Sequence, residues 1–215
     1  MTFSEKDLRL YAVTDRRWLK AGETLESVVE ALLRGGVTLV QLRDKQAGQE
    51  QLLEQTRALL PVCRRYGVKL IVNDYPQVAL ASGADGVHVG QDDMAYEQAR
   101  RILGPDKIIG VSAHNPAEAL RAQAAGADYL GCGAVFGSAT KDGVQTLTPA
   151  GLAAICRAVS IPVVGIGGID EKNIPALNGS GAAGVAVVSA LFAPADKENA
   201  ARRLRARAER MTQGC

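Results

Sequence analysis

Residues 25–45 read LESVVEALLRGGVTLVQLRDK and join one helix to one strand. Apolar residues recur with the helical period over 25–33, and Gly35 and Gly36 follow as a stop signal. The apolar and β-branched run 38–42 comes next and is typical of a strand that is buried on both faces. The stretch therefore predicts a helix that covers a parallel sheet.

Similar short apolar runs recur along the whole chain, at an average spacing of about 25 residues. Helical periodicity fills most intervals, as over 116–126, where Asn115 and Glu118 are start signals, and Asp170 is expected to begin another helix. The pattern predicts an α/β protein, a single (β/α)8 TIM barrel that forms one domain over residues 1–215; a doubly wound sheet is the alternative. The expected strands are 10–14, 38–42, 70–73, 86–89, 108–112, 129–132, 162–166 and 185–188.

The composition excludes several classes of protein. Lys and Arg total 25 and Asp and Glu total 23, a net charge of +2 without the basic footprint of a nucleic-acid-binding protein. No apolar run approaches the roughly 20 residues needed to cross a membrane. The N-terminus lacks a secretory signal, and the four cysteines form no C-x-x-C pair, so we expect a cytoplasmic protein with reduced thiols.

Polar residues concentrate where the second expected strand ends. Gln41, Arg43 and Lys45 share one face of this strand, while Val40 and Leu42 point the other way. If the apolar pair faces the helices, an amide and two cations face the mouth of the barrel, where they could hold a polyanion. The alternative is a frayed strand end with solvated charges.

Two carboxylates follow the third and fourth expected strands. Asp74 and Asp93 would repel each other at the barrel mouth unless a cation lies between them. Mg²⁺, which takes one or two carboxylates and substrate phosphate oxygens, meets that need. The alternative is that Asp74, and either Asp92 or Asp93, are N-caps of the helices that follow.

The ends of the later expected strands also carry polar residues or glycines. Ser112 ends the fifth strand and is either a turn hydroxyl or part of a site, and the loop 133–143 resembles an anion-binding flap. Gly167 and Gly168 after the seventh strand, with Ser189 after the eighth, suit a phosphate cradle of backbone N–H groups. The alternative for the glycine pair is a tight turn between strand and helix, but its coincidence with Ser189 favours phosphate binding.

In this order the motifs resemble the thiamine-phosphate synthase family, and the resemblance covers nearly the whole chain. It is carried by VQLRDK at 40–45, LIVND at 70–74, GVHVGQDD at 86–93, GVSAH at 110–114, TK at 140–141 and GIGGI at 165–169. The resemblance implies a transferase of thiamine biosynthesis. It would condense 4-amino-2-methyl-5-(diphosphooxymethyl)pyrimidine with a thiazole (carboxy)ethyl phosphate, giving thiamine phosphate and pyrophosphate in a magnesium-dependent dissociative substitution.

The resemblance also implies roles for individual residues. The pyrimidine diphosphate would be bound by Gln41, Leu42, Arg43, Asp44, Lys45, Asn73, Ser112 and Lys141. The catalytic members of that set would be Arg43, Lys45, Ser112 and Lys141. The thiazole phosphate would be bound by Ser138, Ala139, Thr140, Gly168, Val188 and Ser189. One Mg²⁺ per subunit would be held by Asp74 and Asp93.

This chain departs from the family pattern at two places. Gly137 and Ser138 stand where the family usually has Pro-Thr, and Asp44 replaces the commoner Glu. The expected partners are small phosphorylated molecules, with no nucleic acid and no membrane, and a homo-oligomer is one alternative for the assembly state.

Three other functions compete with this one. The related thiazole tautomerase shares the barrel but has a histidine where this chain has Ala134. A sugar-phosphate isomerase or epimerase would use Asp74 and Asp93 as acid and base. A non-catalytic module would bind a thiamine precursor or thiamine phosphate without releasing pyrophosphate.

Overall fold

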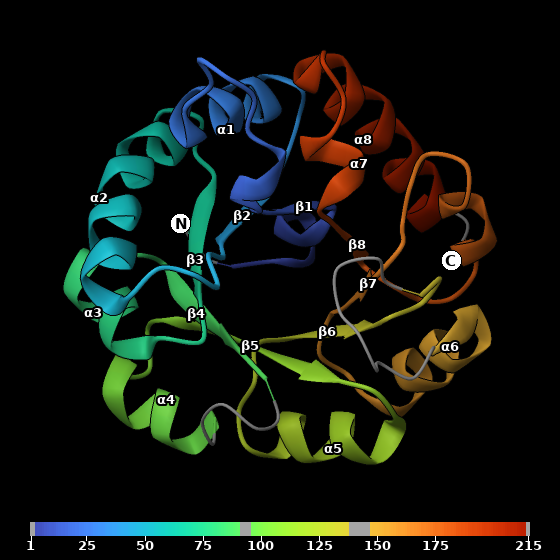
Figure 1. Ribbon diagram of the computed structural model, residues 1–215. Helices are drawn as coiled ribbons and strands as arrows, with labels where there is room; N and C mark the ends of the chain where they lie inside the picture. The colour runs from blue at the N-terminus through green and yellow to red at the C-terminus, as the bar shows by residue number, and fades with distance from the viewer. Residues whose placement is uncertain (1–2, 91–95, 138–146, 214–215) are drawn as a thin grey trace.

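The computed structural model describes residues 3–90, 96–137 and 147–213. Parallel strands close into a barrel in chain order, with helices around its outside (Figure 1). The strands are β1 (Leu10–Val13), β2 (Leu39–Leu42), β3 (Lys69–Asn73), β4 (Gly86–Val89), β5 (Ile108–Ala113), β6 (Tyr129–Gly133), β7 (Val163–Ile166) and β8 (Gly184–Val187). The predicted (β/α)8 barrel is confirmed, and the open doubly wound sheet is wrong, because β8 pairs with β1.

The helices alternate with the strands, and their ends follow the sequence signals. Thr24 caps the first helix by accepting from the Ser27 N–H, and the helix ends at Gly35. Asn115 caps the fifth by accepting from the Glu118 N–H at 2.9 Å. The α-helices are α1 (Leu25–Arg34), α2 (Gln49–Arg65), α3 (Pro76–Ser82), α4 (Tyr96–Leu103), α5 (Pro116–Ala124), α6 (Thr148–Ala158), α7 (Ser189–Phe192) and α8 (Lys197–Gln213); the 3-10 helices are η1 (Glu5–Leu8), η2 (Arg16–Trp18) and η3 (Ile174–Leu177).

The helix expected after Asp170 is reduced to the single turn η3. The Asp170 carboxylate accepts from the backbone N–H groups of Lys172 and Asn173, as a capping residue does. Pro175 lies in that turn, and the left-handed Gly179 and Gly181 come soon after it. Proline is tolerated at the start of a helix, where Pro175 lies, but the positive φ values of Gly179 and Gly181 do not continue a right-handed helix, so the turn ends before a second one forms.

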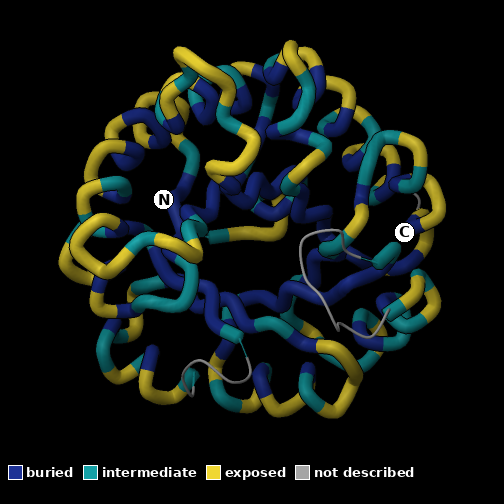
Figure 2. The backbone as a smooth tube through the Cα atoms, viewed as in Figure 1, coloured by how far each residue is buried: buried dark blue, intermediate teal, exposed yellow. Residues whose placement is uncertain are grey.

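The apolar residues form two layers, one inside the barrel and one between the barrel and the helices. In β2, Leu39 belongs to the inner layer, whereas Val40 and Leu42 belong to the outer one. The buried strands and the exposed outer faces of the helices appear in Figure 2. The outward direction of Val40 and Leu42 is thus confirmed, and the alternation turns Gln41 inward.

No helix in the described part of the chain has both the length and the apolar character required to cross a membrane.

Candidate functional site

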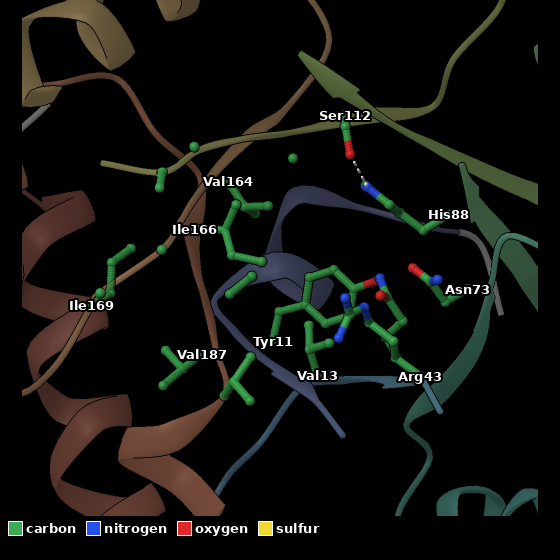
Figure 3. Close-up of a pocket in the computed structure, with 18 of the residues that line it drawn as sticks. Tyr11, Val13, Arg43, Asn73, His88, Ser112, Val164, Ile166, Ile169 and Val187 are labelled. Carbon is green, nitrogen blue, oxygen red and sulfur yellow. Dashed lines mark hydrogen bonds between the residues drawn. The ribbon is translucent and has the colours of Figure 1, made fainter. Parts of the chain in front are cut away.

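A cavity of about 200 Å³ lies at the carboxyl ends of the strands, where the chemistry of such barrels is usually found. Its polar side comes from β1 to β5 and the residues that follow them; its other side is mostly apolar and comes from β7 and β8 (Figure 3). The polar side includes Tyr11, Gln41, Arg43, Asn73, His88, Ser112 and His114. The other side includes Val164, Ile166, Gly167, Gly168, Ile169, Ala186, Val187, Val188 and Ser189.

Arg43 reaches this cavity from the first position beyond β2. Its backbone N–H donates to the hydroxyl of Thr14 at 2.9 Å, and that hydroxyl donates to the Arg43 carbonyl at 3.1 Å. Because Thr14 is fully buried, these bonds extend the pairing of β1 with β2 by one step. The position of the guanidinium therefore depends on the strand pair and not on a loop alone.

The guanidinium of Arg43 is partly buried between carboxylates. Burial lowers its pKa, while the charges of Asp74 and Asp15 act in the opposite direction. Asp15 is itself bound by Arg17, with 2.6 Å between Nη2 and Oδ2, and this hydrogen bond lowers the pKa of Asp15. A partly desolvated cation at a cavity wall interacts strongly with a phosphate.

Asp74 follows β3 in a left-handed backbone conformation, with φ of 66°. Its N–H donates to the His88 carbonyl at 2.9 Å, and its carboxylate accepts from the Asn73 amide. The interpretation of Asp74 as a helix N-cap is wrong, because the N-cap of α3 is Tyr75 and no side chain caps that helix. The turn at Asp74 keeps its carboxylate near Arg43, at the mouth of the barrel.

The donor chemistry of Asp74 fits Mg²⁺, which prefers oxygen ligands and binds through few carboxylates. Within 3–90, 96–137 and 147–213, no group of three or more His, Cys, Asp or Glu side chains could hold a metal ion. Asp74 would therefore bind a cation together with oxygens from elsewhere, such as substrate phosphates. Asp93, its predicted partner, lies outside the described residues.

A continuous row of hydrogen bonds crosses the barrel along the polar side of the cavity. The Gln41 amide Nε2 donates to the Tyr11 hydroxyl at 2.6 Å, and the Tyr11 and Tyr129 hydroxyls lie 2.8 Å apart. His88 continues it, with Nδ1 3.0 Å from the Tyr129 hydroxyl and Nε2 3.1 Å from the Ser112 hydroxyl. We call these five residues the polar row. Both its ends, Gln41 and Ser112, line the cavity, as do Tyr11 and His88, while Tyr129 does not.

Two glycines make room for the rings of this row. A Cβ atom at Gly110 would lie 2.1 Å from Cζ of Tyr129, and one at Gly131 would lie 2.9 Å from Cε1 of His88. Both distances are too short for real atoms. The inner faces of β5 and β6 are therefore shaped to receive the phenol and the imidazole.

On the opposite side, Gly167 and Gly168 have φ values of 97° and 64°. A Cβ at Gly168 would lie 2.8 Å from the carbonyl oxygens of Phe136 and Gly137, so a side chain does not fit there. The Asn173 amide donates to the Gly168 carbonyl at 2.7 Å and holds this loop. The exposed backbone at Gly168 suits the approach of a phosphate.

The structure brings seven of the predicted site residues to one cavity, places Asp74 near Arg43 but not among the residues that line that cavity, and puts three others elsewhere. The seven are Gln41, Arg43, Asn73, Ser112, Gly168, Val188 and Ser189. Leu42 points into the outer apolar layer, and the Asp44 carboxylate accepts from Gln55 on α2. Lys45 is exposed beyond the cavity wall. Lys141, Ser138, Ala139 and Thr140 lie outside the described residues.

Sequence reasoning missed the phenols of the polar row. Tyr11 and Tyr129 occur in apolar runs, where they look like ordinary strand-forming residues. The signal that could have found them is the alternation along each strand, because Tyr11 alternates with the outward Leu10 and Ala12, and Tyr129 shares its face of β6 with Gly131, which leaves room beside it. His114 lies beside the N-terminus of α5, with its Nδ1 2.9 Å from the Glu118 carboxylate.

The sequence matches the family model described as thiamine monophosphate synthase over residues 10–191. It is 51% identical to the thiamine-phosphate synthase of Chloroflexus aurantiacus over 201 residues, which are 93% of this chain and 92% of that protein. It is 46% identical to a chloroplastic thiamine biosynthetic bifunctional enzyme of Arabidopsis thaliana, over 88% of this chain but 37% of that protein. The solved structure of thiamine phosphate pyrophosphorylase from Pyrococcus furiosus superimposes with a TM-score of 0.88 at 38% identity, covering 96% of this chain and 98% of that one.

Proposed function

Since the chain belongs to the thiamine monophosphate synthase family, we propose that it forms thiamine phosphate from a pyrimidine diphosphate and a thiazole phosphate. The bond between the pyrimidine methylene carbon and the diphosphate oxygen breaks, and its electron pair leaves with pyrophosphate. The thiazole nitrogen supplies the pair for the new carbon–nitrogen bond. The 4-amino group of the pyrimidine stabilises the cation that forms between these steps.

One observation carries this proposal: a single cavity has two walls of different chemistry. Arg43, Asn73 and Ser112 offer a cation, an amide and a hydroxyl on one wall. The opposite wall offers the bare backbone of Gly168 beside Ser189. A condensation of two phosphorylated substrates needs such a pair of sites, because each reactant must be held by its own phosphate while the rings meet between them.

The departing diphosphate would be neutralised by cations of this chain. Arg43 is in place at the wall, and Lys45 and Lys141 are proposed to join it when the substrate is bound. At an effective dielectric constant of about 20, one cation about 4 Å from the departing charge contributes roughly 4 kcal/mol. Positioning and charge neutralisation would then account for much of the rate, without a nucleophilic side chain.

Mg²⁺ is the proposed cofactor, one per subunit, held by Asp74 and Asp93 together with diphosphate oxygens. When bound, it supplies additional neutralisation of the leaving group. Asp74 contributes a carboxylate that its left-handed turn keeps near Arg43. We propose that Gln41 and Asn73 orient the pyrimidine diphosphate at the same time.

The thiazole phosphate is proposed to bind on the β7–β8 side. Gly168, Val188 and Ser189 line the cavity there, and we propose that Ser138, Ala139 and Thr140 complete the site. The apolar Val164, Ile166 and Val187 on this side suit a thiazole ring.

The proposal is tested by incubating the protein with both substrates and Mg²⁺ and measuring thiamine phosphate and pyrophosphate. We expect both products in equal amounts, no product when the thiazole phosphate is omitted, and loss of turnover with EDTA. Arg43→Gln is expected to lower turnover by at least about 100-fold, because the uncompensated leaving charge raises the barrier. Turnover that survives EDTA and the Arg43 change would contradict the assignment.

The same incubation separates the competing functions. A tautomerase would convert the thiazole alone, but Ala134 supplies no base at the cavity wall. An epimerase acting through Asp74 would need no metal, and a binding module would retain thiamine phosphate without releasing pyrophosphate. We further propose that residues 1–215 act as one domain in the cytoplasm, and that the assembly is a homo-oligomer.

A further inference from the structure

The donor and the acceptor at each contact of the polar row can be assigned one after another, starting from Gln41. Gln41 Nε2 donates to the Tyr11 hydroxyl, so the Tyr11 oxygen is an acceptor at that contact. The Tyr11 hydrogen then needs an acceptor of its own, and among the described residues only the Tyr129 hydroxyl lies within reach. The Tyr129 hydrogen is then left for Nδ1 of His88, which lies 3.0 Å from the Tyr129 hydroxyl. A neutral imidazole that accepts at Nδ1 carries its hydrogen on Nε2, which lies 3.1 Å from the Ser112 hydroxyl.

The surroundings favour this arrangement. Tyr11 and Tyr129 are 1% and 0% exposed, and burial raises the pKa of both phenols well above the usual value. Each phenol thus keeps one hydrogen to donate. The reverse direction would leave the Tyr11 hydrogen without an acceptor among apolar neighbours such as Leu39 and Ile71, and this is costly for a buried donor.

We propose that Tyr129 and His88 are positioning residues that fix the polarity of the row, so that the site selects an aminopyrimidine. With its nitrogen bound to Tyr11, the Gln41 amide presents its oxygen as an acceptor. The Gln41 oxygen would thus accept a hydrogen bond from the exocyclic amino group of the substrate.

This inference rests on the proposed function and makes it more specific. A 4-oxopyrimidine carries a carbonyl oxygen where the 4-aminopyrimidine carries N–H donors. If the Gln41 amide could rotate, it would accept either ring, but the row holds it in one orientation. A Gln41 oxygen held in place would face the carbonyl oxygen of a 4-oxopyrimidine. Two acceptors would then meet without a hydrogen between them, and this disfavours the binding of the 4-oxo compound.

The space left for these rings also supports a positioning role. Gly110 and Gly131 are the positions on β5 and β6 that admit the Tyr129 phenol and the His88 imidazole. Filling the interior would require only apolar rings, such as phenylalanine. The hydroxyl of Tyr129 can therefore be removed while the packing of its ring is kept, and this allows a direct test.

The test uses the full chain with Tyr129→Phe, and Tyr11→Phe as a second variant if the first does not fold. The binding of 4-amino-2-methyl-5-(diphosphooxymethyl)pyrimidine and of its 4-oxo counterpart is measured with Mg²⁺ and without thiazole phosphate. We expect the unmodified protein to prefer the amino compound by at least about 100-fold, and either variant to lose about tenfold or more of that preference. Affinity for the thiazole phosphate should stay the same. Tyr66→Phe, at the surface, is the matched control.

Nitrogen NMR of the His88 ring provides an independent measurement. We expect the Nε2–H tautomer in the unmodified protein and a mixture of tautomers in Tyr129→Phe. Detection of the Nδ1–H tautomer in the unmodified protein would overturn the proposed polarity. Full selectivity in both variants, with only a lower melting temperature, would show that the row is structural. If the unmodified protein binds neither pyrimidine, the proposed function itself fails, a result distinct from the other two.

Discussion

The buried hydroxyl of Thr14 exchanges two hydrogen bonds with the backbone of Arg43, accepting at 2.9 Å and donating at 3.1 Å. Thr14→Val keeps the shape of the side chain but removes both bonds. We expect this change to lower the free energy of unfolding by about 1–3 kcal/mol, because two backbone groups lose their partner. We also expect a higher KM for the pyrimidine diphosphate, since Arg43 is displaced. Thr14→Ser retains the hydroxyl and should behave almost as the unmodified protein in denaturant titrations and steady-state kinetics.

Gly131→Ala would place a methyl group 2.9 Å from Cε1 of His88. The imidazole has to move, and its bond to Ser112 should break. We expect a loss of about 1–3 kcal/mol in stability, together with lower affinity for the pyrimidine diphosphate. Gly48→Ala is the matched control, because nothing lies within 4 Å of its added Cβ. Equal behaviour of the two variants in calorimetry and substrate titration would contradict a role for this glycine in placing the imidazole.

Asp74→Asn removes the negative charge of the side chain while the backbone conformation is kept. Asparagine tolerates the left-handed conformation at this position, so the fold should be kept. A neutral amide is a weaker Mg²⁺ ligand than a carboxylate, and we expect the Mg²⁺ concentration for half-maximal turnover to rise by at least about tenfold. Asp106 is exposed and precedes β5, so Asp106→Asn should leave the Mg²⁺ concentration for half-maximal turnover unchanged. Magnesium titrations of activity that coincide for both variants would exclude Asp74 as a ligand.

Alkaline pH should destabilise the fold through Tyr11 and Tyr129. Burial raises the pKa of both phenols above the value of about 10 that they have when unfolded. The unfolded chain therefore loses these protons first, so stability is complete below about pH 10 and falls as the pH rises further. The slope should approach about 1.4 kcal/mol per pH unit for each phenol. In urea titrations at a series of pH values, Tyr129→Phe should lose half of that slope, with Tyr66→Phe as the surface control. An unchanged slope in Tyr129→Phe would show that the alkaline instability arises from other groups.

Part of the site could be predicted because it depends on local order. Gln41 and Arg43 alternate with Val40 and Leu42, and a strand that is buried on both faces turns such an alternation toward opposite sides. The same reasoning extended too far at Lys45, which lies beyond the end of β2 and is exposed, because the alternation ceases where the strand pairing ends.

Other features depend on which strands face each other across the barrel. Tyr129 on β6 meets His88 on β4 and Tyr11 on β1, although neither strand is hydrogen-bonded to β6. No pattern within a short stretch of the sequence indicates that these three side chains meet inside the barrel. The N-cap interpretation of Asp74 failed for a similar reason, since its left-handed turn is stabilised by a bond to the His88 carbonyl on the neighbouring strand.

The order of apolar runs and helix signals by itself determined the α/β class, the alternation of Val40 and Leu42 with Gln41 and Arg43, and the position of polar groups at the strand ends, because periodicity and capping act within a few residues. Only closure of the barrel decided that Gln41 and Ser112 become the two ends of one buried row through Tyr11, Tyr129 and His88. The physical reason is that hydrogen bonds between distant strands depend on the register and curvature of the whole sheet, which no single segment of the chain specifies.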